Sequence, residues 1–149
     1  MLSKIGNKKG FTLIEVIVVI ALLAILATIV LVAINPAQNS KDARNTKRRS
    51  DVLQVLNAVN QYYVANGSFP SGMPTIAQSP ADIKSGATPA GDICSGIVPT
   101  YIAALPYDTG GNYTSCSTYD TKYTISIVTG NRVTVSVTDS EGTGISATR

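Results

Sequence analysis

The chain has few side chains of the kinds that carry out catalysis. It contains no His and only two Cys. Most zinc sites and most nucleophile–base pairs need His or several Cys, so those kinds of site lack their parts here. One of the nine acidic residues, Glu15, lies inside a long apolar run. The composition therefore indicates that the chain is not an enzyme and directs attention to this isolated acid.

The apolar run from Phe11 to Ile34 contains one charged residue, Glu15, and two other polar residues, Thr12 and Thr28. As a helix it would span roughly 36 Å, against about 30 Å for the hydrocarbon core of a bilayer. A cleaved secretory signal is disfavoured, because the apolar part of such a signal is usually only about 7–15 residues long. An uncleaved membrane anchor explains the length of the run but gives Glu15 no purpose.

An acid in a membrane span is expected to have a partner. A charge at the centre of a spanning helix costs about 2.5–3.5 kcal/mol, and less near the interface. Glu15 lies near the start of the run, and no Lys, Arg or His occurs between Phe11 and Lys41. The cation that could reach Glu15 is therefore a new α-amino group, created by a cut just before Phe11.

The residues around this acid resemble a known signature. The stretch KKGFTLIEV, which begins at Lys8, is similar to the start of the prepilins: the type IV pilins and the pseudopilins of type II secretion and DNA-uptake machines. In that family a membrane peptidase cuts after the Gly and methylates the new N-terminus. The resemblance implies a leader peptide over residues 1–10, cleavage between Gly10 and Phe11, and N-methylation of Phe11.

The resemblance also implies a role for Glu15 in filament assembly. Glu15 becomes the fifth residue of the mature chain, where the family places an acid thought to pair with the N-terminus of a neighbouring subunit. Much of the Coulomb gain of such a pair offsets desolvation, so the pair selects axial register more than it adds stability. The implied partners are other copies of the chain, the prepilin peptidase, an inner-membrane assembly platform, and minor pilins or pseudopilins.

Beyond the run, an amphipathic helix is predicted over about 37–65. Pro36 removes a helical hydrogen bond, so a kink is expected near Ile34–Asn35. Apolar residues then recur at steps of three and four, which predicts one buried helix face, with Asp51 on the polar side. Gly67 and Pro70 mark the end of this helix. The apolar face comprises Val52, Val55, Leu56, Val59, Tyr62 and Tyr63.

A basic cluster near the start of this helix has two interpretations. The cluster comprises Lys41, Arg44, Lys47, Arg48 and Arg49. It could contact anionic lipid or DNA, but no aromatic side chains are interleaved to stack on bases. Three of the 12 basic residues lie in the leader, and the other nine balance nine acids, so the charge balance does not support DNA binding. We favour a solvated segment whose cations pair with acids of neighbouring subunits.

The stretch 66–121 is rich in Gly, Pro, Ser and Thr and is predicted to form loops. Cys94 and Cys116 both lie in it. In an oxidising compartment a disulfide between them would contribute about 3 kcal/mol, and two free thiols remain the alternative.

Two further segments resemble those of major pseudopilins and related pilins. They are RRSDVLQVLNAVNQYYVANGSFP, which begins at Arg48, and YIAALPYD, which begins at Tyr101. Major pseudopilins often hold calcium in a C-terminal loop. The oxygen donors here are Asp108, Asp120, Asp139 and Glu141, but they follow no ligand-loop spacing, so solvated acids in turns are the favoured interpretation. No other cofactor is expected.

Alternating apolar and hydroxyl residues predict a β-hairpin over about 122–138, with Gly130-Asn131 as a two-residue turn. Packed on the helix at Val52–Tyr63, such a sheet would complete an α+β, pilin-like head. The last ten residues are expected to be loose.

The chain is therefore expected to comprise a leader (1–10), a membrane-spanning assembly helix (11–36) and a periplasmic or extracellular head (37–149). The expected function is that of a structural major subunit, which polymerises into a type IV pilus after cleavage and methylation. Two alternatives stay open: the major pseudopilin of a secretion or DNA-uptake pseudopilus, and a monomeric membrane-anchored binding module. The expected location is the cell membrane, as a single-pass precursor with a cytoplasmic leader, and then an extracellular or periplasmic filament.

Overall fold

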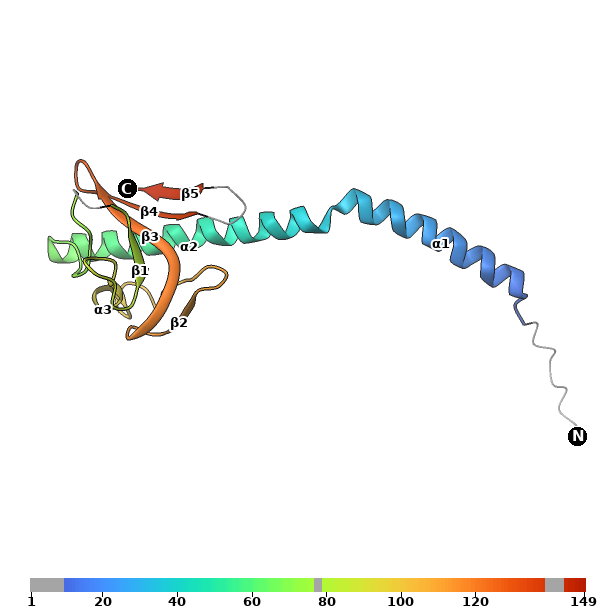
Figure 1. The fold of residues 1–149 in the computed structure, drawn as a ribbon, viewed down its shortest axis with the longest axis horizontal. Helices are drawn as coiled ribbons and strands as arrows, with labels where there is room; N and C mark the ends of the chain where they lie inside the picture. Colours follow the sequence, from blue (N-terminus) through green and yellow to red (C-terminus); the bar gives the residue numbers. More distant parts are fainter. Residues whose placement is uncertain (1–9, 77–78, 139–143) are drawn as a thin grey trace, which may run out of the picture. The chain divides into compact units, whose positions relative to one another are not determined.

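The structure is a computed structural model that describes residues 10–76, 79–138 and 144–149 (Figure 1). Its elements, in order, are α1 (Leu13–Ile34), α2 (Pro36–Asn66), β1 (Ala81–Lys84), α3 (Cys94–Ile97), β2 (Asn112–Ser115), β3 (Thr118–Val128), β4 (Arg132–Thr138) and β5 (Gly144–Thr148). The chain divides into two compact units, Met1–Asp42 and Ala43–Arg149, and the second unit is called the head below. In the head, α2 packs on an antiparallel sheet, which confirms the predicted α+β, pilin-like class.

Helix α1 covers most of the apolar run. Its 22 residues include none that is buried in the chain. The described residues contain one helical stretch that is long and apolar enough to cross a bilayer, and α1 is its apolar part.

The helical chain is interrupted at Asn35, where the sequence predicted a kink. Asn35 lies in the left-handed region, with φ 42° and ψ 73°, which Asn tolerates better than most residues. Pro36 is then the first residue of α2, a position at which its missing N–H would have no helical partner. The carbonyl of Ile34 accepts a hydrogen bond from Nδ2 of Asn39 at 2.9 Å. The predicted kink is confirmed, and one side chain on its C-terminal side, that of Asn39, satisfies the carbonyl of Ile34.

Helix α2 ends as its sequence predicted. Gly67 has a φ of +71°, and its N–H donates to the carbonyl of Tyr63 at 2.8 Å. A glycine in this conformation closes a helix at no steric cost. The buried residues of α2 are Arg48, Asp51, Val52, Val55, Leu56, Ala58 and Val59. The prediction that Asp51 lies on the polar side is therefore wrong.

The sheet has the strand order β1-β3-β4-β5, and β2 also pairs with β3. Two predictions are corrected here. The stretch 66–121 is not all loop, because it contains β1, α3, β2 and the first residues of β3. The C-terminal tail is not loose over 144–148, because β5 pairs with β4 from Thr138↔Gly144 to Thr134↔Thr148. These elements are mostly four or five residues long, too short to show a clear alternation.

The hairpin between β3 and β4 differs in one detail from the prediction. Val128 pairs with Arg132, so three residues form the turn rather than two. Gly130 and Asn131 both have positive φ, 82° and 56°, as expected for the residues that were assigned to the turn. The prediction that Gly130 and Asn131 lie in the turn is confirmed, but the turn also includes Thr129.

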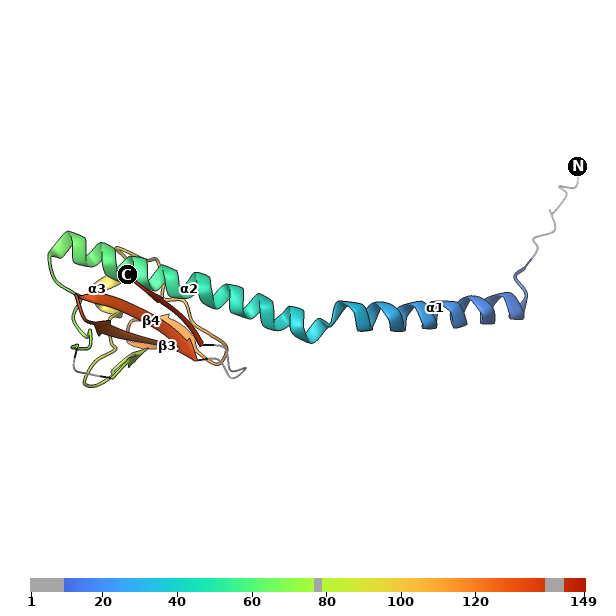
Figure 2. The same ribbon diagram turned by 90° about the horizontal axis from the view of Figure 1, so that it is seen from above.

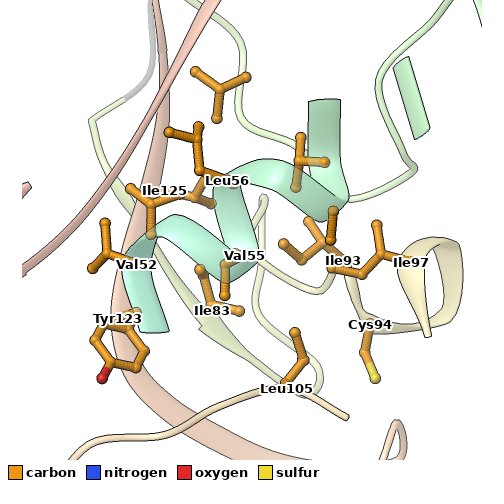
Figure 3. Packing of buried hydrophobic residues seen from close by; sticks show 14 of the residues in the cluster. Val52, Val55, Leu56, Ile83, Ile93, Cys94, Ile97, Leu105, Tyr123 and Ile125 are labelled. Atoms are coloured by element: carbon orange, nitrogen blue, oxygen red, sulfur yellow. The ribbon is translucent and has the colours of Figure 1, made fainter. Parts of the chain in front are cut away.

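The core of the head lies between α2 and the sheet and extends to α3 (Figure 3). Val55 and Val59 of α2 and Tyr123 and Ile125 of β3 are completely withdrawn from solvent. Cys94, at the start of α3, is also buried and forms a disulfide with Cys116, with a Cα–Cα distance of 5.3 Å. The predicted disulfide is thus confirmed, and it ties α3 to the turn between β2 and β3.

Candidate functional site

The most unusual surface of the molecule is α1 itself. Large apolar side chains along it are half exposed or more: Ile14 is 70 %, Leu31 63 % and Val32 81 % exposed. Burying one such side chain contributes about 1.5–3 kcal/mol, so leaving a whole helix of them in water is strongly unfavourable. Lipid or other protein must therefore cover α1.

The N-terminus of α1 is closed by Thr12 and Glu15. The backbone N–H and the hydroxyl of Thr12 each donate to Oε2 of Glu15 at 2.8 Å. The N–H of Glu15 donates in return to the Thr12 hydroxyl oxygen at 3.3 Å. This reciprocal arrangement is a capping box, and it places a negative charge at the positive end of the helix dipole.

The sequence suggested that Glu15 has no partner before cleavage, but the cap gives it hydrogen-bond partners within its own chain. The Thr-x-x-Glu spacing was visible in the sequence, and it is the signal that sequence reasoning missed. The capping box uses Oε2 of Glu15, and among the residues that the structure describes Oε1 accepts no hydrogen bond. The carboxylate is therefore held in place by its own chain with one oxygen still available.

The junction at which the leader was expected to end is open. Gly10 is exposed, and a Cβ added to it would have no neighbour within 4 Å. Phe11 is 88 % exposed. Both residues precede the first residue of α1, Leu13, so the bond between them lies outside the helix. This placement leaves the bond accessible to another protein.

Thr28 is the remaining polar residue of the apolar run. Its hydroxyl donates to the carbonyls of Ala24 and Ile25, at 2.7 and 3.0 Å. The hydroxyl is therefore satisfied within the helix and requires no partner in an apolar environment.

Of the basic cluster that was predicted to be a solvated segment, Arg48 is buried, Arg44 is half-buried, and Lys41, Lys47 and Arg49 are exposed. Arg48 is buried, with 3 % of its surface exposed, and its Nε donates to both carboxylate oxygens of Asp108 at 2.9 Å. Lys47 donates to Asp51 at 2.6 Å and to the carbonyl of Tyr107 at 2.7 Å. Arg48 and Lys47 therefore link α2 to the segment around Asp108, although the Lys47 side chain stays exposed to solvent.

Asp51 joins this group to the sheet. Its Oδ2 accepts from Lys47 and also from the hydroxyl of Tyr123 on β3, at 2.8 Å. Burial, followed by the hydrogen bond to Asp51, raises the pKa of the Tyr123 phenol above its usual value. Burial alone would raise the pKa of Asp108, but hydrogen bonds from Arg48 and from the Thr109 N–H outweigh it, so that pKa lies below its usual value.

Of the four calcium candidates, the structure describes two, Asp108 and Asp120, and each of them is paired with a cation of the chain. Asp108 is bound by Arg48, and Asp120 accepts from Nζ of Lys122 at 2.6 Å. Asp139 and Glu141 lie outside the described residues. Among the residues at 10–76, 79–138 and 144–149, no three acidic, Cys or His side chains gather as a metal site would require.

Comparison with known proteins gives one match, which covers most of α1 and the residues just before it. A family model described as the prokaryotic N-terminal methylation motif matches residues 5–31. No curated protein and no solved structure matches the chain. The motif implies processing by a prepilin peptidase and assembly into filaments, and it does not reach the head. Residues 5–31 therefore give this chain the N-terminal signature of the type IV pilins and pseudopilins.

Proposed function

We propose that the chain is a major structural subunit that is cut between Gly10 and Phe11, methylated on Phe11 and polymerised through α1 into a type IV pilus. The single observation that carries this proposal is α1, an apolar helix with no buried residue and with one acid at its start. Neighbouring copies can cover such a helix once it has left the lipid, and a bundle of these helices would form the interior of a filament.

Glu15 supplies the specificity of this packing. Cleavage creates an ammonium group on Phe11, and Oε1 of Glu15 is the oxygen that the capping box leaves available. A neighbour in the wrong register would leave both charges unpaired in an apolar environment, which is costly. The pair therefore selects one axial offset between subunits. This contact is heterologous, and heterologous contacts that do not close into a ring give open filaments.

One observation bears on the alternative, a pseudopilus of a secretion or DNA-uptake machine. Arg48 and Asp108 belong to the two segments that resemble major pseudopilins, and their side chains bind each other. This ion pair brings the two segments together in the head, as expected if both belong to a head fold that the chain shares with the major pseudopilins. Filaments that can be sheared from the cell surface at native expression would favour the pilus, and filaments seen only on overexpression would favour the pseudopilus.

The test is the mature N-terminus of the protein from its native membrane, by intact mass and N-terminal fragmentation. Methylated Phe11 at the start is the expected result. A start at Met1, together with unchanged behaviour of Glu15→Gln, would leave the monomeric membrane-anchored module as the better description. If the wild-type chain is processed as proposed, the Glu15→Gln variant should also be cleaved normally but should yield few filaments.

A further inference from the structure

A hollow lies in the head between the first turns of α2 and the segment 106–111. In the head the sheet lies along one side of α2 (Figure 2), and Lys47 and Arg48 bind this segment to the helix. The hollow has a volume of about 470 Å³, and its lining includes Arg44, Lys47 and Tyr107. Tyr107 is 46 % exposed, and Nζ of Lys47 lies 5.8 Å from the centre of its ring. Two cations and an aromatic ring therefore meet at one open place on the surface of the head.

The two acids that line this hollow are already paired with cations of the chain. Asp51 accepts from Lys47 at 2.6 Å, and Asp108 accepts from Arg48 at 2.9 Å. Arg44 is half-buried, and the Lys47 side chain keeps 58 % of its exposure. An anion that enters the hollow would therefore meet cations before it met an unpaired carboxylate. The hollow favours a negatively charged ligand.

Positive charge also dominates the part of α2 that leads to the hollow. Between Pro36 and Ser50 the sequence has five basic residues and one acid, Asp42. Asp42 accepts from Nε2 of Gln38 at 3.0 Å. Lys41 is exposed and precedes Arg44 by three residues, so their side chains are neighbours on the helix surface. Anions are thus attracted to this part of the helix as well as to the hollow.

The hollow lies close, along the chain, to the end of the apolar run. α1 ends at Ile34, and Arg44 follows ten residues later, which is at most about 15 Å at the rise of a helix. Helical side chains point toward the N-terminus of their helix, so Lys41 and Arg44 extend toward the start of α2. The headgroup layer of a bilayer is about 5–7 Å thick on each side of the hydrocarbon. Long basic side chains can bridge the remaining distance to lipid phosphates.

We propose that the hollow and Lys41 bind phosphate groups of anionic lipid in the membrane that α1 spans. Arg binds a phosphate through paired hydrogen bonds, and Lys binds it as a point charge. Tyr107 adds an amphipathic ring of the kind that is enriched where membrane and water meet. The contact holds the head at the membrane surface before assembly. It requires that α1 spans a bilayer and does not require a filament, so it can fail independently of the proposed function.

The chain contains no Trp, so Tyr107→Trp gives a single fluorescent reporter in the hollow. The carbonyl of residue 107, which accepts from Lys47, is retained in this variant. The full chain is reconstituted in vesicles of phosphatidylcholine alone or of phosphatidylcholine mixed with phosphatidylglycerol. Both kinds of vesicle contain a lipid with a spin label on its headgroup, which quenches Trp fluorescence at short range. The fraction of the fluorescence that is quenched is measured.

Two single variants of the reporter chain each remove one cation, Lys41→Gln and Arg44→Gln. The matched control is Arg132→Gln, because Arg132 is exposed and lies at the turn between β3 and β4. Formation of the Cys94–Cys116 disulfide, checked with a thiol reagent, shows that each variant folds.

The turn between β3 and β4 is distant from the hollow. Val133, the second residue of β4, exchanges backbone hydrogen bonds with Arg149, and Nη1 of Arg149 donates to Asn57. Asn57 lies about 20 Å further along α2 than Arg44. A second reporter, Thr129→Trp, therefore samples the head away from the proposed contact.

The reporter at position 107 should be quenched roughly threefold more in the anionic vesicles than in the neutral ones, and high salt should remove this difference. Lys41→Gln and Arg44→Gln should each abolish most of it, since one basic residue near an anionic surface changes binding about fivefold. Arg132→Gln should leave it unchanged, and the reporter at position 129 should not respond to the lipid.

Two results would overturn the inference: equal quenching at position 107 in both kinds of vesicle, or equal effects of Arg44→Gln and Arg132→Gln. Neither result would affect the proposed function, which is tested by the mature N-terminus and by filaments. Conversely, a wild-type chain that forms no filaments would overturn the proposed function and leave the lipid contact standing.

Discussion

The Arg48 guanidinium and the Asp108 carboxylate form an ion pair that lies almost wholly inside the head. Nε of Arg48 donates to both oxygens at 2.9 Å, and the side chains retain only 4 % and 10 % of their exposure. Nη1 of Arg48 donates to Asn45 at 3.0 Å. The pair fastens the segment around Asp108 to the first turns of α2 in the head.

Removing one partner of this pair should be severe. Arg48→Ala is expected to lower the free energy of unfolding by about 3–5 kcal/mol, because the Asp108 charge is left buried and unpaired. Urea unfolding of the full chain in detergent, followed by near-UV circular dichroism of the tyrosines, measures the effect. Arg49→Ala is the control, since Arg49 is exposed and should change stability by less than about 0.5 kcal/mol. A double Arg48→Leu, Asp108→Leu variant should recover much of the loss. Equal stability of Arg48→Ala and Arg49→Ala would contradict this account.

The same pair predicts the behaviour of the head in acid. The pKa of Asp108 is lower in the folded head than in the unfolded chain, where Asp has a pKa of about 3.9. The stabilisation is therefore complete above about pH 4 and is lost as the pH falls through the folded value. Urea midpoints measured from pH 5 to pH 2 should fall less steeply in Asp108→Asn than in wild type. Parallel curves would show that this carboxylate does not titrate with unfolding.

Features that depend on residues close together in the sequence could be predicted, and contacts between residues far apart in the sequence could not. The apolar face of α2 follows from a local period of three and four residues, and the hairpin from a local period of two. Arg48 and Asp108 are 60 positions apart in the sequence. A polar residue in a predicted helix gives no sign that its partner lies in a distant loop. For that reason Arg48 and Asp51 were assigned to solvent, although both are buried.

The short strands were missed for a related reason. β1 has four residues and β5 has five, so neither shows an alternation that stands out from loop sequence. Each is a strand because β3 or β4 offers a free edge beside it. At the N-terminus, by contrast, the capping box of Thr12 and Glu15 is local and was open to prediction from its spacing alone.

The disulfide should carry a measurable share of head stability. Cys94→Ser with Cys116→Ser is expected to lower the free energy of unfolding by about 2–4 kcal/mol, since the bridge restricts the unfolded chain. The buried Cys94 site also has to accept a hydroxyl in this variant. Unfolding of the wild type with and without reductant measures the effect of the bridge separately. A variant with unchanged stability would mean that the bridge contributes little beyond the packing of α3.

The capping box predicts that two replacements of Thr12, by Val and by Ser, differ in their effect on the start of α1. Thr12→Val keeps the shape but removes the hydroxyl that bonds Glu15, whereas Thr12→Ser keeps the hydroxyl. Loss of an N-cap costs about 1 kcal/mol, which corresponds to roughly fivefold faster amide exchange in the first turn of α1. Hydrogen exchange of residues 13–16 in detergent micelles should show this increase for Thr12→Val and not for Thr12→Ser. The same exchange rate in both variants would mean that Glu15 is held by another group.

Variants at the break at Asn35 can test whether side chains determine where a helix is interrupted. Asn39 donates to the carbonyl of Ile34 at 2.9 Å, and Asn35 accepts from the Gln38 N–H through its side chain at 3.3 Å. Asn39→Leu should leave the Ile34 carbonyl without a protein partner, at a cost of about 1–3 kcal/mol where water is scarce. Gln38→Leu is the matched control, because within the described residues the Gln38 side chain bonds Asp42 alone, at 3.0 Å, while its backbone bonds to Asn35 are retained. In micelles, amides 36–40 should exchange faster in Asn39→Leu, by tenfold or more, and remain near wild type in Gln38→Leu. If both variants exchange alike, then Pro36 alone determines the break, and the amide of Asn39 is incidental to it.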